Sequence, residues 1–409
     1  MMRPEIVPPS PQRASPKGEP DFSLVLGGPL YQLYLAARLI RPPLKLLPRR
    51  VVGISLICWL PTMLLSAFGG RLTAGTPVPF LLDPEVHTRL LVAIPLLIVA
   101  EVLVHNRISM VIAQFLERGI VAQQDQASFQ KLIGSSMRLR NSVTAELVLL
   151  ALVAGVGYEM WSHNLTITQA NFVMSSWYAD KTDTGMHLTA AGSYYALVSL
   201  SVFRFLLIRW YFRLFIWYRF LWRLRAMPLH FSLYHPDRAG GLGFLSASLV
   251  AFAPVFVAQT STLAAVIFAK IRYAGDKLPA FTMEVAGALL IFVLLLILPL
   301  SFFAVQLERA ARIARREFGA LSSRYVDDFR LKWVQGGARE GEPLLGTSDI
   351  QSLADLANSF NVISEMRLLP INKEAMLRLV ILITVPLLPL VLTVVPAREI
   401  VQRLFKLVF

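Results

Sequence analysis

The stretch that decides the fold is EVAGALLIFVLLLILPLSFFAVQ, residues 284–306. After the glutamate at its start it carries no charged residue. A helix rises about 1.5 Å per residue, so about 20 apolar residues cross a hydrocarbon core of about 30 Å. This stretch therefore predicts a transmembrane helix.

Six further runs have the same character, and they lie at 51–69, 88–108, 142–160, 190–209, 244–269 and 375–396. Of the 409 residues, 55% are hydrophobic and 16% are charged, whereas soluble domains carry about 25% charged residues. This composition excludes an ordinary soluble enzyme, a disordered chain and a disulfide-stapled secreted module. We expect an all-α, polytopic helical membrane protein with about seven transmembrane helices. Prolines in the last run leave six crossings as the alternative.

The chain divides into five parts. Residues 1–21 are proline-rich and predict a disordered arm, and 22–50 predict an amphipathic, basic segment lying on anionic lipid headgroups. Residues 51–306 form the membrane domain with six spans. Residues 307–374 predict a cytoplasmic helical segment, too short for a large core of its own, that packs on the membrane domain or on a protein partner. Residues 375–409 predict the last span and a C-terminal amphipathic helix.

The basic residues predict the orientation. With the N-terminus inside, the inner segments hold 31 of the 40 lysines and arginines, as expected for cytoplasmic loops. The net charge of +14 is then explained by anionic headgroups, and we expect no nucleic-acid partner. The single cysteine, Cys58, excludes an intrachain disulfide.

Two motifs carry a family resemblance: HPDRAGGLGFL at 235–245 and LLGTSDIQSLADLANSF at 344–360. With GGPLYQLYLAARLIRPP, QFLERGIV and RWYFRLFIWYRFLW, they make the chain resemble a family of uncharacterised bacterial multi-pass membrane proteins. The resemblance implies a location in the bacterial inner membrane. It implies no activity, cofactor or site residue.

Ionisable residues inside the spans are the first candidate site, because a charge in hydrocarbon is costly and faces a partner or water. The expected depths place four of them at one level of the inner leaflet: Glu101, His105, Glu146 and Arg204. They form either a structural ion-pair cluster or a site that relays protons or binds a cation. Four arginines just beyond, Arg209, Arg213, Arg219 and Arg223, share one helical face. They predict an interfacial helix that binds lipid phosphates, with an anion vestibule as the alternative.

Two further groups are candidates. The loop residues His235, Asp237, Arg238, Gly240 and Gly241 either aim the adjoining helices or bind an anionic ligand at a helix N-terminus. The polar residues of the fifth span either pack helices together or line a polar pathway; they are Gln259, Thr260, Ser261 and Thr262. Ala151 and Gly155 allow close helix contact, so an oligomer is an open alternative.

The leading functional hypothesis is a transporter or channel for a small ion or solute. The sequence has no nucleotide-binding or hydrolase motif, and its six histidines lack metal-ligand spacing. We therefore expect no metal and no cofactor. The alternative is a non-catalytic scaffold or sensor that binds partners through its cytoplasmic loops. A lipid-modifying enzyme that uses His235, Asp237 and Arg238 is a third hypothesis.

Overall fold

The computed structural model describes residues 22–42, 44–162, 175–182, 185–343 and 347–393. This part of the chain is a helical bundle with one antiparallel hairpin of two short strands, β1 (Ala179–Thr182) and β2 (Gly185–Leu188). The all-α, polytopic fold is thereby confirmed. The disordered segment expected at 1–21 and the C-terminal amphipathic helix expected at 394–409 lie outside the described residues.

Six helical segments are long and apolar enough to cross a membrane. They are α2 (Leu47–Phe68), α3–η2–α4 (Pro84–Glu117), α7–η4–α8 (Ala190–Leu224), η5–α9–η6 (Leu242–Ala274), η7–α10 (Leu278–Ile297) and α13–η10 (Lys373–Thr393). Within these, α4 is Ile94–Glu117, α8 is Leu200–Leu224, α9 is Ser246–Ala269, α10 is Thr282–Ile297 and α13 is Lys373–Thr384. A seventh helix, α6 (Val143–Ser162), follows α5 (Gln126–Arg140), and this pair is bent by 43°.

The helix whose crossing decides between six and seven spans is thus α6, because of the bend before it. The sequence analysis had instead attached this alternative to the last span. The prolines of the last span tighten its second half into a 3₁₀-helix, Val385–Thr393, without ending it. Two other spans run well past their expected inner ends at 108 and 209. The arginines that lower the hydropathy there interrupt the apolar run but not the helix.

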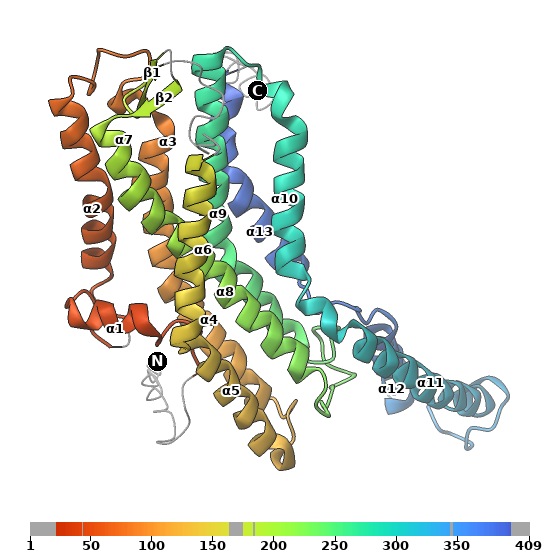
Figure 1. The fold of residues 1–409 in the computed structure, drawn as a ribbon. Helices are drawn as coiled ribbons and strands as arrows, with labels where there is room; N and C mark the ends of the chain where they lie inside the picture. Colours follow the sequence, from red (N-terminus) through yellow and green to blue (C-terminus); the bar gives the residue numbers. More distant parts are fainter. Residues whose placement is uncertain (1–21, 43, 163–174, 183–184, 344–346, 394–409) are drawn as a thin grey trace, which may run out of the picture.

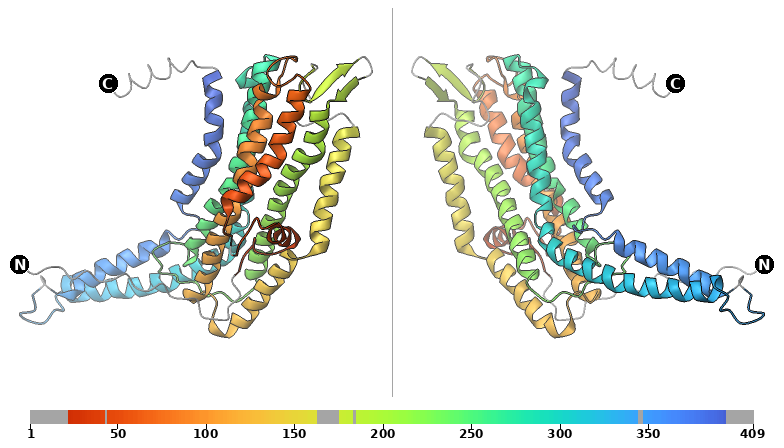
Figure 2. Two further views of the ribbon diagram at one scale, coloured as in Figure 1. Left: turned by 90° about the vertical axis from the view of Figure 1, so that its left-hand side faces the viewer. Right: turned by 90° about the vertical axis from the view of Figure 1, so that its right-hand side faces the viewer.

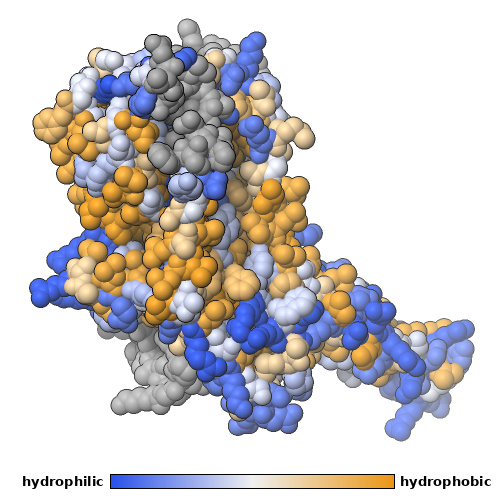
Figure 3. All heavy atoms as spheres, viewed as in Figure 1, coloured by the Kyte–Doolittle hydropathy of each residue, from blue (hydrophilic) through white to orange (hydrophobic). Residues whose placement is uncertain are grey.

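Helix α9 is the centre of the bundle, and it packs against α4 and α13 (Figure 1). Two-thirds of its apolar window is buried, against 11% for the peripheral α10. On α10, Leu290 and Ile291 are more than half exposed. Apolar side chains cover the flank of the bundle that Figure 3 shows, and hydrophilic ones gather at its lower end. Such extended exposed apolar surface marks a membrane contact, so the chain is a multi-pass membrane protein.

A helical arm leaves the bundle after α10. Pro299 cannot continue the helix, a 3₁₀ turn follows, and α11 (Ala304–Phe329) runs away from the spans (Figures 1 and 2). Helix α12 (Ser348–Ser364) returns alongside it. Asp349 joins the two helices near the tip, because it accepts hydrogen bonds from Lys332 at 2.8 Å and from Trp333 at 2.9 Å. We call this hairpin the arm; most of it projects from the membrane domain and does not pack on it.

The segment before the first span is helical only in part. Helix α1 (Pro29–Ala36) lies across the lower end of the bundle (Figure 1), and the expectation that the segment rests on lipid headgroups stays a prediction. The four residues Phe22–Val25 are almost fully buried against it. The start of the described chain is therefore built into the membrane domain.

Candidate functional site

Glu101 of α4 is the centre of a buried charged cluster. Its side chain is 5% exposed, and its two carboxylate oxygens accept from guanidinium groups of two other spans. Arg50 of α2 donates at 2.6 Å and Arg213 of α8 at 2.8 Å. The charges of three helices, which lie far apart in the sequence, therefore meet at one carboxylate.

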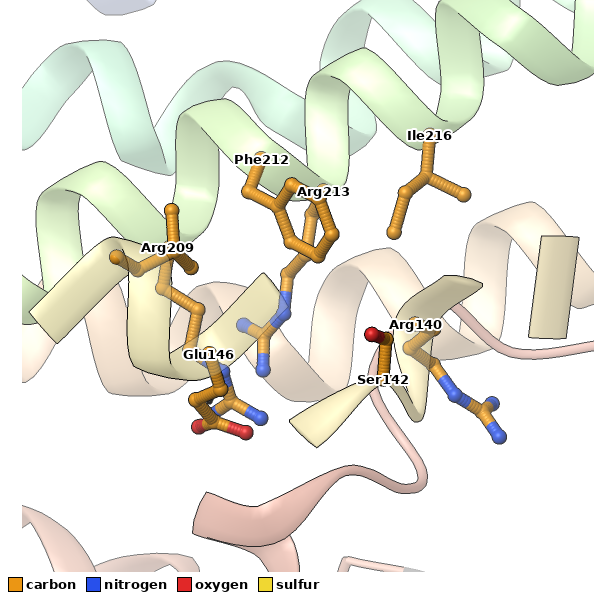
Figure 4. A pocket seen from close by; sticks show the side chains of 8 residues that line it. Arg140, Ser142, Glu146, Arg209, Phe212, Arg213 and Ile216 are labelled. Atoms are coloured by element: carbon orange, nitrogen blue, oxygen red, sulfur yellow. Dashed lines mark ion pairs between the residues drawn. The ribbon is translucent and has the colours of Figure 1, made fainter. Parts of the chain in front are cut away.

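Arg209 connects this carboxylate to a second one. One turn before Arg213 on α8, its guanidinium lies 3.9 Å from Glu101 and 3.7 Å from Glu146 of α6. Figure 4 shows Arg209 and Arg213 reaching from α8 toward the level of Glu146. The two glutamates that the sequence predicts at one depth thus converge, with a guanidinium between them.

That guanidinium is not the predicted one. Arg204 lies instead against Gly157 of α6 and within electrostatic range of Arg89, Tyr178 and Tyr195. Because α8 continues to Leu224, residue 209 does not mark the inner end of the span. Five residues along a helix correspond to about 7.5 Å and 140°, which separates Arg204 from the cluster.

His105 and the segment Phe22–Leu30 contact the residues of the cluster. The His105 ring lies 3.0 Å from the Ser23 hydroxyl, and Arg140 donates to the Ser23 carbonyl at 2.5 Å. The backbone N–H of Leu30 donates to Glu146 at 3.2 Å. We call Phe22–Leu30 the cover segment. Its tightest point is Gly27, where a side chain would overlap Asn141.

The cluster carries an excess of positive charge. Among the described residues, Arg50, Arg209 and Arg213 pair with two carboxylates, Glu101 and Glu146, and Arg140 lines the same pocket as Glu146. A shallow, partly open pocket lies beside them, and its enclosed space is about that of one water molecule (Figure 4). Its lining residues are Arg140, Ser142, Glu146, Leu149, Arg209, Phe212, Arg213 and Ile216.

Arg209 is the lining residue with the most unused binding capacity. It is 6% exposed, yet among the described residues it forms only the two long ion pairs and no hydrogen bond. A guanidinium carries five N–H donors and binds carboxylates and phosphates in bidentate fashion. The lining holds three arginines and one carboxylate, Glu146, which accepts from Leu30 and lies 3.7 Å from Arg209. Because the lining has this net positive charge, the pocket is better suited to an anion than to a cation.

A second buried cluster, which the sequence analysis missed, lies at the opposite end of the same helices. Asp83 accepts from the Trp177 indole at 2.7 Å, and Arg89 donates to the Tyr195 hydroxyl at 2.5 Å. Glu85 lies 3.7 Å from Arg89. The stretch Asp-Pro-Glu at 83–85, a capping residue followed by proline at the first helical position, is the signal that could have located this helix start.

In the loop 235–245, Asp237 organises the backbone. Its carboxylate accepts from the N–H groups of Ala239 at 2.8 Å, Gly241 at 3.1 Å and Gly243 at 2.8 Å, and it lies 3.1 Å from the His235 ring. With its lone pairs used in this way, Asp237 shapes the loop and leaves little for a ligand. This favours the structural interpretation of the motif.

The same loop binds the end of the arm that adjoins the membrane domain. Arg238 forms an ion pair with Glu365, and its carbonyl accepts from the N–H of Arg367 at 2.7 Å. Gly240 has a φ of +63°, and a side chain there would press on Leu307 and Met366. The anion-binding alternative for this loop stays a prediction.

The polar residues of α9 bond mainly within their own helix. Thr260 and Ser261 donate to the carbonyl of Val257, and Thr262 donates to that of Ala258, at 2.7–3.1 Å. Gln259 accepts from Tyr211 of α8 at 2.5 Å. These contacts are those of helix packing, and the alternative of a polar lining gains no support from them.

Comparison with protein-family models, with curated proteins and with solved structures finds no match to this chain. The resemblance carried by the two motifs therefore stays a prediction. Within the described residues, no group of three or more His, Cys, Asp or Glu side chains could hold a metal ion.

Proposed function

We propose that this chain is a transport protein of a bacterial inner membrane that binds an anionic ligand at the arginine-lined pocket. The observation that carries the proposal is Arg209, a buried guanidinium with unused donors at the wall of a pocket. The surrounding excess of arginine over glutamate attracts anions and repels cations. The sequence analysis favoured cation or proton binding at Glu101 and Glu146, and the pairing of Glu101 argues for the opposite sign.

We propose that the pocket lies on the cytoplasmic side, together with the N-terminus. The ends of α5 and α8 and the whole arm lie at the same end of the bundle (Figure 1). These segments are rich in arginine, as in Arg219, Arg223, Arg312 and Arg316. An excess of basic residues is typical of the cytoplasmic side of a membrane.

A flux assay in reconstituted vesicles tests the proposal. The purified chain is inserted into phosphatidylcholine vesicles, and the movement of chloride, phosphate, potassium and protons is followed under imposed gradients. We expect flux of an anion that Arg209→Gln lowers about tenfold or more, because a charge-assisted contact is removed. Arg324→Gln, an exposed arginine of α11 away from the pocket, is the matched control. Cation flux, or anion flux unchanged by Arg209→Gln, would contradict the proposal.

A second candidate function, a scaffold or sensor, is favoured by the arm. The arm projects from the bundle (Figure 2) and exposes Ile313 and Leu321. We would replace both by aspartate and purify the chain from its native membrane. A protein that copurifies with the wild type and is lost from this variant supports the scaffold. Anion flux that the variant retains separates the two functions.

A further inference from the structure

The pocket has two chemically different walls. Arg140, Arg209 and Arg213 form the charged wall, while Leu149, Phe212 and Ile216 contribute apolar side chains. A small hydrated anion uses the charged wall alone. An amphiphile with a charged head and an apolar tail uses both.

The position of the pocket along α6 is that of a lipid headgroup. Arg140 and Ser142 line it just before Val143, where the apolar helix begins. Leu147 and Val148, one turn further, are about 60% exposed on the outer face of that helix. Charged residues at the start of a span meet the headgroup region, and the apolar residues beyond meet acyl chains. The pocket thus lies at the depth of the headgroups, while the exposed face of α6 is roughly 130° around the helix from Glu146 and Leu149.

We propose that this pocket binds the phosphate group of an anionic membrane phospholipid, with Arg209 and Arg213 holding the phosphate oxygens. Arg140 lies at the rim of the site, and the acyl chain lies along the apolar side chains of Leu149, Phe212 and Ile216. The inference rests on the proposed anion preference of the same pocket and deepens it, since it names the ligand class. The shared chemistry is a phosphate oxyanion on paired guanidinium groups, and free phosphate is the other source of it.

A binding assay on the full chain in a zwitterionic detergent separates these sources. The probes are dioctanoyl phosphatidylglycerol, dioctanoyl phosphatidylcholine and inorganic phosphate, and heat of binding is measured by titration. We expect saturable binding of phosphatidylglycerol, with both other probes about tenfold weaker or more. Arg209→Gln weakens phosphatidylglycerol binding about tenfold, because a bidentate charge-assisted contact is lost. Arg324→Gln, an exposed arginine of α11 away from the pocket, leaves it unchanged.

A second variant distinguishes a loss of lipid binding from a loss of folding. Arg140 is only partly buried, so Arg140→Gln preserves the interior and is expected to weaken phosphatidylglycerol binding severalfold. Equal binding of phosphatidylglycerol and phosphatidylcholine, or unchanged affinity in both variants, overturns the inference. Inorganic phosphate that binds as tightly as the lipid overturns the lipid assignment and leaves the anion preference intact. Lipid binding without anion flux supports the inference while the transport function fails, so the two failures are distinguishable.

Discussion

Replacing Glu101 by glutamine is the perturbation that best probes the architecture of the membrane domain. The wild-type carboxylate neutralises Arg50 and Arg213 directly and Arg209 at longer range. With glutamine, these buried guanidinium groups retain Glu146 as the cluster's remaining anion. Removing one partner of a buried ion pair costs about 3–5 kcal/mol. We expect a loss of stability in this range, because α2, α4 and α8 are no longer held at a common point.

The assay is thermal unfolding of the purified chain in detergent, followed by tryptophan fluorescence. Glu117→Gln, an exposed position at the end of the same helix, is the matched control and should change stability by less than about 0.5 kcal/mol. Adding Arg213→Gln to Glu101→Gln removes one uncompensated charge, so the double variant should lose less than the sum of the two single losses. A Glu101→Gln chain as stable as the control, or strictly additive losses, would refute the reasoning.

Two further predictions concern other parts of the fold. A Cβ at Gly192 would overlap the carbonyl oxygen of Tyr178, so Gly192→Ala should destabilise the chain by about 1–3 kcal/mol; Gly155→Ala, into open space on α6, should be neutral or stabilising in the same melting assay. At the arm, hydrogen bonding to Lys332 lowers the pKa of Asp349, so the tip contact is fully present above the ordinary pKa of about 3.9 and is lost as the pH falls through the lowered value. Amide hydrogen exchange at the start of α12, corrected for its intrinsic pH dependence, should therefore rise in the wild type only below the ordinary carboxyl pKa of about 3.9, whereas Asp349→Asn should exchange faster at every pH without that step.

The spans could be predicted from the sequence because hydropathy is a local property. The convergence of Glu101 and Glu146 followed from the cost of a charge in hydrocarbon. The sequence did not show that Arg209, and not Arg204, lies between these two glutamates, because that depends on where α8 ends. Arg209 and Arg213 resemble interfacial residues in a hydropathy profile, and only the packing of α8 against α4 shows that they are buried.

In the loop 235–245, too, the local contacts could be predicted from the sequence and the long-range contacts could not. Asp and Gly at close spacing predict a turn in which a carboxylate accepts backbone N–H groups, and Asp237 does so. The ion pair of Arg238 with Glu365 joins residues 127 positions apart. Such a contact depends on the path of the whole chain, so no local pattern indicates it.

The attachment of the arm has a mechanical consequence. From Ala304 to Val334 the outgoing helix has 31 residues, or roughly 45 Å at about 1.5 Å each. The outgoing helix is joined to α10 through Pro299 and a 3₁₀ turn. The chain after the returning helix α12 is bonded to the 235–245 loop through Glu365 and, at Pro370 and Asn372, to Ser246 at the start of α9. Because both ends of the arm are attached to the membrane domain, the arm cannot rotate freely about its base. A force on its tip is therefore transmitted to α9 and α10.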